Sequence, residues 1–281
     1  GTNFNGLKKP LGSLAGRFLS VRESTEKLLS NLSEEDACVQ SMADASPAKW
    51  HAAHTTWFFE TFILKEHEEN FTPFDSKFES LFNSYYNSVG EQFTRHLRGL
   101  ITRPSLSKIV AYREEITNRI LNIIDTQMNP KVLELIEIGL NHEQQHQELL
   151  VMDIKHLFSI NPTYPAFCNS NIPSSLPEDN CWVSVEGGLC SFGKSDSTFH
   201  FDNETPSHKR YLENYKIASQ LVSNGEFLDF IDDGGYENPL LWLSDGWSWV
   251  RENTIGHPLY WIKKDNSWLE FTLFGLSPLN L

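Results

Sequence analysis

The segment at residues 129–160 constrains the fold more than any other part of the sequence. It opens with Asn129-Pro130, a helix-capping residue followed by proline at the first helical position, and contains no further proline. Two imidazoles interrupt an otherwise core-facing stripe at helical spacing, which runs through Leu135, Gly139, His142, His146, Leu149 and Asp153. The segment therefore predicts a long helix packed against other helices. The two histidines on its buried side need a polar partner or a ligand there.

Three other segments repeat the helical pattern. Residues 11–32 and 105–127 carry apolar side chains at helical spacing, and residues 46–68 begin with Ser46 as the expected N-cap and Pro47 at the first helical position. A shorter aromatic stretch covers residues 78–89. Four long helices and one short helix predict an antiparallel four-helix bundle over residues 10–158.

The character of the chain changes after residue 160. Residues 161–180 contain Pro162, Pro165, Pro173 and Pro177 and are interpreted as a linker, and short β-like pieces, turns and most of the tryptophans follow. We therefore expect an α+β protein with a helical bundle at 1–160, a linker at 161–180 and a mixed domain at 181–281. Because no closing helix or strand signal precedes Leu281, that domain is expected to be partial, with exposed apolar surface that favours low stability or self-association.

Bulk properties exclude several classes of protein. A net charge of −14 over 281 residues argues against nucleic acid or an anionic membrane as the main partner. No apolar run approaches the roughly 20 residues that cross a bilayer, and residues 1–4 show no secretion signal. The four cysteines form no CxxC pair, which favours free thiols. We expect a cytoplasmic protein.

The histidine pair in the long helix indicates a metal. His142 and His146 are four residues apart, so their side chains project within about 40° of each other. Glu143 completes an HExxH motif, but the downstream third-ligand candidates of a zinc protease (Glu148, Asp153 and His156) lie on the same helix, too close for that arrangement. A pair of hydrogen-bonded surface histidines remains the alternative to a metal site.

A third ligand is available upstream. His51 and His54 lie three residues apart on the predicted helix at 46–68, and helical bundles build metal sites from side chains on facing helices. The residues alone leave the choice between His51 and His54 open.

Two segments carry a family resemblance. SPAKWHAAHTTWFFE at 46–60 and NHEQQHQELLVMDIKH at 141–156 resemble the signature segments of ergothioneine-biosynthesis sulfoxide synthases. Residues 199–247 are similar to the start of the second domain of that family, and the resemblance spans about residues 10–275. It implies a DinB-like bundle followed by a domain that resembles the formylglycine-generating enzyme, with a C-type-lectin-like fold.

The resemblance also implies a site. His54 closes the family's W-x-x-x-H pattern, so the implied iron(II) ligands are His54, His142 and His146, with nitrogen–metal distances of roughly 2.0–2.2 Å, and His51 is the reserve candidate. Gln145 is implied to contact the imidazole substrate. Arg95 and Arg98 have the spacing of the arginines that bind the carboxylates of the thiol substrate, and Arg103 competes with them.

The implied reaction joins a cysteine-type thiol, cysteine or γ-glutamylcysteine, to C2 of the trimethylhistidine imidazole with iron(II) and O2. Zinc fits the same ligands, so the choice of iron rests on the resemblance. Ovothiol-type and selenoneine-type synthases and a non-catalytic metal-binding module are the alternatives. The family's proton-donating tyrosine is expected beyond Leu281, so no catalytic residue is assigned, and the 281-residue chain is expected to bind metal without completing turnover. Six residues are expected to serve the fold instead: Asp202, Asn203, Tyr236, Asp245, Trp247 and Tyr260.

Overall fold

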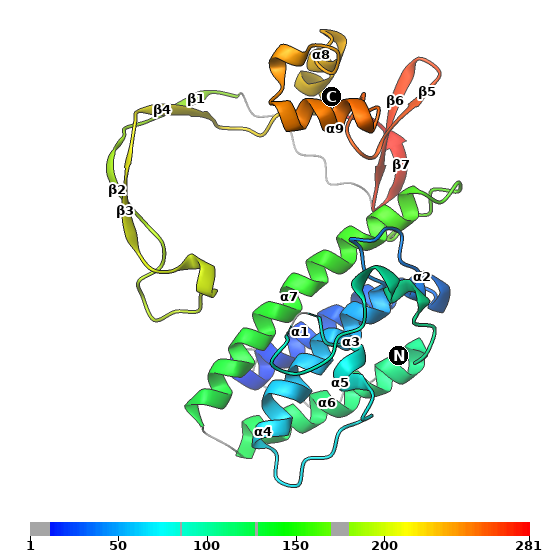
Figure 1. Cartoon of the computed structure of the whole chain (residues 1–281), viewed down its shortest axis with the longest axis vertical. Coiled ribbons are helices and arrows are strands. Elements are labelled where there is room, and N and C mark those ends of the chain that lie inside the picture. The colour runs from blue at the N-terminus through cyan, green and yellow to red at the C-terminus, as the bar shows by residue number, and fades with distance from the viewer. Residues whose placement is uncertain (1–11, 85, 127–128, 170–179) are drawn as a thin grey trace. The chain divides into compact units, whose positions relative to one another are not determined.

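A computed structural model of the chain describes residues 12–84, 86–126, 129–169 and 180–281. The chain divides into two compact units, Gly1–Cys168 and Asn169–Leu281. The first is helical, and the second combines short helices with small sheets (Figure 1), which confirms the predicted α+β class. Residues 1–4, which the search for a secretion signal concerns, and half of the predicted linker, residues 170–179 with Pro173 and Pro177, lie outside the described residues.

Four long helices form the first unit: α1 (Leu14–Leu29), α3 (Ala48–Phe59), α6 (Leu106–Thr126) and α7 (Pro130–Ser159). Helices α1 and α3 each contact both α6 and α7, and the four lie side by side in Figure 1. Asn129 caps α7 as predicted, since its side chain accepts a hydrogen bond from the Lys131 N–H. The predicted four-helix bundle is confirmed.

The start of α3 differs by one residue from the prediction. Pro47, with φ −58° and ψ 145°, is the N-cap and makes no side-chain cap bond. The Ser46 hydroxyl instead accepts a hydrogen bond from Arg98 Nη1 at 2.9 Å, so Ser46 does not cap the helix. At its other end α3 continues through a π-helical turn, Glu60–Leu64, into α4 (Lys65–His67).

Short elements connect the long helices: α2 (Glu34–Cys38), α5 (Phe78–Leu81) and a 3-10 helix at Arg95–Leu100. The helix expected within residues 78–89 is thus limited to four residues. The remaining described residues of that stretch form turns, in which the Asn83 amide bonds three backbone carbonyls.

Helices α3 and α7 approach closely beside the histidines. A Cβ atom at Gly139 of α7 would lie 2.4 Å from Cε1 of Phe59, well inside van der Waals contact. Glycine at this position therefore allows the aromatic face of α3 to pack directly on α7.

A buried ionic cluster joins α1, α6 and α7. The Glu143 carboxylate accepts hydrogen bonds from Arg22 Nη1 and Arg113 Nη2, both at 2.8 Å, and from the Thr25 hydroxyl at 2.6 Å. The side chains of Glu143 and both arginines are fully buried. Although burial alone would raise the pKa of Glu143, the two guanidinium groups lower it to about 2, so the cluster holds a carboxylate.

The second unit contains three small antiparallel sheets. Strands β1 (Trp182–Val185) and β4 (Tyr215–Ala218) form one pair, β2 (Gly188–Phe192) and β3 (His208–Leu212) form another, and β5 (Trp261–Lys264), β6 (Ser267–Thr272) and β7 (Gly275–Pro278) form a three-stranded sheet. Helices α8 (Asn224–Asp232) and α9 (Ser244–Glu252) and 3-10 turns at Asp202–Glu204 and Pro239–Leu241 lie between the strands.

The second unit buries few apolar side chains. Its buried apolar side chains among the described residues are Val250, Trp261 and Phe271. Tyr236 packs against Phe230 and Trp242, with ring centroids 5.7 and 5.5 Å apart. The four cysteines, all within the described residues, form no disulfide. Every described helix of the chain is too short or too polar to cross a membrane.

Candidate metal centre

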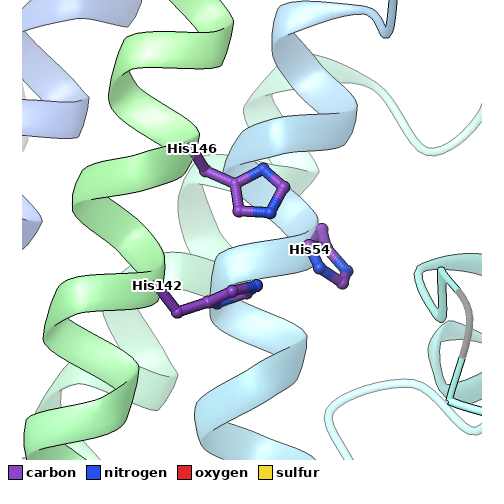
Figure 2. Close-up of side chains that lie close together, drawn as sticks. All are labelled: His54, His142 and His146. Carbon is purple, nitrogen blue, oxygen red and sulfur yellow. The ribbon is translucent and has the colours of Figure 1, made fainter. Parts of the chain in front are cut away.

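Three histidines from two helices converge on one space. His142 and His146 project from α7 and His54 projects from α3 (Figure 2). One ligand nitrogen from each ring lies within 4.8 Å of the other two. The centroids of the three rings are 4.6–5.0 Å apart. The structure thus brings together the three residues that the family resemblance implied as ligands.

The ring of His54 is held on several sides. Its Nδ1 lies 2.6 Å from the Phe82 carbonyl oxygen, an acceptor, so Nδ1 carries the proton and Nε2 carries the lone pair. The ring is also stacked between Trp50 at 4.5 Å and Trp57 at 5.3 Å, with interplanar angles of 11° and 15°. These contacts leave the imidazole little freedom to rotate.

His142 and His146 differ in what holds them. His146 Nδ1 lies 2.9 Å from Nδ1 of His51, which leaves its Nε2 available. His142 Nδ1 is buried and has no hydrogen-bond partner within the described part of the chain. A buried polar atom without a partner is costly, and a bound ion that reorients the ring is one way to relieve that cost.

All three imidazoles are kept neutral. Burial lowers the pKa of His142 to about 4. Burial, followed by the charge that each protonated neighbour would carry, also holds the pKa of His54 and His146 well below its usual value. A neutral imidazole is the form that binds a metal.

These residues fit a metal ion. Three imidazole nitrogens suit iron, zinc, copper or nickel. Nitrogens bound to one ion at about 2.1 Å lie roughly 3.0–3.4 Å apart, so the rings, with nitrogens up to 4.8 Å apart here, would close around it by a modest side-chain movement.

A cavity of about 380 Å³ opens beside the three rings. Its lining includes the other predicted site residues, Arg95, Arg98 and Gln145, as well as His51. Arg103, the competing arginine, is not part of this lining. The cavity therefore joins the candidate metal ligands to the residues nominated for substrate binding.

The two arginines differ in environment. Arg95 is exposed, and its Nη2 donates to the Asp44 carbonyl oxygen at 2.6 Å. Arg98 is 5% exposed, its guanidinium lies 3.5 Å from the centroid of the Trp50 ring, and its Nε has no hydrogen-bond partner among the described residues. Burial lowers the pKa of Arg98 to about 10, so the side chain is a cation at neutral pH.

Glu143 does not belong to this site. Both of its oxygens are bonded within the ionic cluster with Arg22, Arg113 and Thr25, and it does not line the cavity. It therefore has no free oxygen to serve as the general base of a protease, and that interpretation of the HExxH motif is wrong for the arrangement seen here.

The predicted core stripe of α7 is also displaced. The fully buried positions of the helix include Ile136, Gly139, Leu140, Glu143, Leu150 and Ile154, whereas His142 and His146 are half-buried at the edge of that stripe. They lie there because the cavity opens beside them, and Leu149 is 38% exposed for the same reason.

Two features of the site escaped sequence reasoning. One is the stacking of Trp50 and Trp57 on His54, although their spacing of four and three residues on one helix is a signal for a shared face. The other is the contact of His51 with Asp153, because nothing in the sequence pairs those two positions.

Two known protein families match different parts of the chain. Residues 17–150 match the DinB superfamily, and residues 172–269 match the sulfatase-modifying factor enzyme 1-like domain. The chain is 24% identical over 257 residues to the hercynine oxygenase of Mycolicibacterium smegmatis and 25% identical over 253 residues to that of Mycobacterium tuberculosis. These matches cover 89% and 88% of this chain.

The relatives are longer than this chain. The two matches cover 57% of each hercynine oxygenase, so the chain spans little more than half of their length. A third relative, ergothioneine biosynthesis protein 1 of Schizosaccharomyces pombe, is 29% identical over 118 residues, which are 40% of this chain and 13% of that protein.

Proposed function

Since the chain belongs, at modest identity, to an ergothioneine sulfoxide synthase-like family, we propose that it contributes the metal centre of an oxygenase in ergothioneine biosynthesis. The reaction would join a cysteine-type thiol, cysteine or γ-glutamylcysteine, to C2 of the trimethylhistidine imidazole as a sulfoxide, with O2 as the oxidant and water as the second product. The observation that carries this proposal is the convergence of His54, His142 and His146 beside a cavity that also contains Arg98, which pairs with no acidic side chain among the described residues.

The three histidines would hold iron(II) through their neutral rings. Iron bound by three imidazoles keeps coordination positions for a thiolate and O2 and supplies the oxidising chemistry that forms the carbon–sulfur bond. The protein's own part is to hold the ligand set in place. Stacking fixes His54, the Phe82 carbonyl fixes its proton, and the close approach of α3 and α7 at Gly139 sets the distance between the ligand-bearing helices.

Arg98 would bind a carboxylate of the thiol substrate. Its guanidinium is buried, it forms no ion pair with an acidic residue in the described part of the chain, and one of its N–H groups is unbonded. A buried cation without a counter-ion favours an anionic ligand, and a guanidinium can bond both oxygens of a carboxylate. Arg95 would add a second positive charge at the exposed side of the same cavity.

Gln145 would contact the imidazole substrate. Its side chain lines the cavity one residue before His146, and its amide offers both a donor and an acceptor. The neighbouring Gln144 is also exposed but does not line the cavity, so the two glutamines form a matched pair for an experiment.

The binding roles are tested with iron(II)-loaded protein under anaerobic conditions. Gln145→Ala should weaken trimethylhistidine binding by roughly 2- to 13-fold, the value of one hydrogen bond, while iron content stays near one per chain. Gln144→Ala should change neither quantity. Equal losses of substrate and iron in Gln145→Ala would assign Gln145 to the fold rather than to the substrate.

The reaction is tested separately, on the full-length gene product, by sulfoxide formation from trimethylhistidine, a cysteine-type thiol, iron(II) and O2. Product that disappears with His142→Ala supports the proposal. If the three histidines bind iron but no O2-dependent product forms, the protein is a non-catalytic metal-binding module. A preference for unmethylated histidine would instead favour an ovothiol-type reaction.

A further inference from the structure

A chain of hydrogen bonds leads away from the candidate metal centre. His146 Nδ1 lies 2.9 Å from His51 Nδ1, and His51 Nε2 lies 2.7 Å from Asp153 Oδ2. The same Asp153 oxygen accepts the backbone N–H of Ser46 at 3.0 Å. His51 is 3% exposed and Asp153 is 7% exposed, so water has little access to either group.

Asp153 Oδ2, the acceptor at the end of these hydrogen bonds, determines which ring nitrogens carry protons. Asp153 Oδ2 already accepts the Ser46 N–H and so acts as an acceptor, and His51 Nε2 donates to it. A neutral imidazole carries only one N–H, which leaves His51 Nδ1 as an acceptor. Burial lowers the pKa of His51, in agreement with the neutral ring.

Two ring nitrogens 2.9 Å apart need one proton between them. Because His51 Nδ1 accepts, His146 Nδ1 must donate, and the lone pair of His146 is then on Nε2. His54 also carries its proton on Nδ1, because that nitrogen donates to the Phe82 carbonyl oxygen. His142 Nδ1 has no such partner among the described residues.

We propose that His51 and Asp153 are positioning residues that hold His146 in the tautomer with a proton on Nδ1 and a free Nε2, before any metal is bound. The pair connects the same two helices as the ligands, since His51 lies on α3 and Asp153 on α7. His51 thus has a role beside the metal rather than on it. Only the effect on metal affinity rests on the proposed function.

Loss of the His51–Asp153 pair is expected to weaken metal binding by a measurable factor. A partner that orients a metal-ligating histidine typically changes metal affinity by about 10- to 100-fold. Without His51, the His146 ring is free to move its proton to Nε2, which blocks the nitrogen that a metal would use. Of its two described partners, Asp153 would keep the Ser46 N–H and lose the His51 ring.

The experiment assigns the tautomer of His146 by 15N–1H correlation spectra of the metal-free chain labelled with 15N-histidine. The wild-type spectrum is expected to show a proton on Nδ1. His51→Phe should shift the ring toward the Nε2–H form and weaken Co(II) binding by about 10- to 100-fold. His51→Asn, which places an amide oxygen near the lost Nδ1, should retain the Nδ1–H form and bind Co(II) within a few-fold of wild type.

His156→Phe is the matched control. His156 also lies on α7 and also uses Nδ1, in a bond to Ser41 Oγ at 2.7 Å, but it does not line the cavity. It should leave both the His146 tautomer and the Co(II) affinity unchanged.

Two results would overturn the proposal: a wild-type His146 protonated on Nε2, or a His51→Phe chain with unchanged tautomer and affinity. The wild-type spectrum decides the proton position even if a variant fails to fold. An Nδ1–H ring in a chain that binds no metal would refute the proposed function and leave the positioning of His146 intact.

Discussion

The histidines of the two units show what burial adds to a side chain. In the helical unit His54 and His51 are nearly inaccessible, and their ring nitrogens have partners far along the chain. In the second unit His200, His208 and His257 are bonded to carbonyl oxygens one or two residues away. The residue type is the same in both units, but only the helical unit desolvates and orients the ring.

The apolar side chains show the same difference. Trp57, Phe59 and Ile120 of the bundle are completely buried, whereas Trp182, Leu189 and Tyr211 of the second unit are about 70% exposed. Four long helices can cover one another, and two-stranded ribbons in the described structure cannot. If this comparison is right, equal substitutions in the two units should have very unequal effects.

The largest effect is expected at the ionic cluster. Glu143→Gln removes the negative charge between two buried guanidinium groups, and breaking such a cluster costs roughly 3–5 kcal/mol of unfolding free energy. Glu213→Gln, at an exposed position of the second unit, should cost less than about 0.5 kcal/mol. Urea denaturation of both variants measures the difference, and a small loss in Glu143→Gln would mean that the cluster does not stabilise the bundle.

Two isoleucines, one in each unit, should differ somewhat less in how much unfolding free energy their loss costs. Ile120→Ala in α6 leaves a cavity where the side chain is fully buried and should cost about 2–5 kcal/mol. Ile217→Ala in β4 removes a side chain that is 56% exposed and should cost about 0.5 kcal/mol. Thermal unfolding followed by circular dichroism at 222 nm reports the first change. Equal costs would show that the second unit buries Ile217 in solution.

The smallest contrast uses glycine. Gly139→Ala forces a Cβ atom against the Phe59 ring and should cost about 1–3 kcal/mol, with a measurable loss of metal affinity because α3 and α7 are pushed apart. Gly256→Ala meets no atom within 4 Å and should be neutral or stabilise by up to about 1 kcal/mol. Unchanged stability in Gly139→Ala would indicate that the two helices can separate without cost.

Sequence reasoning succeeded where the signal is local. Helical spacing and the Asn129-Pro130 start located α7 to within a residue. The choice of His54 over His51, which rests on the resemblance, stays a prediction, and His54 lies with His142 and His146 in a group that could hold a metal. Sequence reasoning failed where partners come from distant segments. The bonds of Glu143 to Arg22 and Arg113 and of His51 to Asp153 depend on the rotation of each helix, which the spacing of apolar residues defines only roughly.

In the second unit the short strands leave only a weak pattern in the sequence. Most positions of β1 and β3 are exposed on both faces, so the alternation that identifies a half-buried strand is missing. The sequence therefore predicted turns and β-like pieces there but neither the strand pairing nor the register.

Anomalous diffraction from crystals of the iron(II)-loaded chain would show whether His54, His142 and His146 form one metal site. We expect one anomalous peak per chain within roughly 2.0–2.2 Å of a nitrogen of each of these three residues, with His51 remaining hydrogen-bonded to His146. A peak bonded to His51 in place of His54, a peak at the exposed histidines of the second unit, or no bound iron would contradict this expectation.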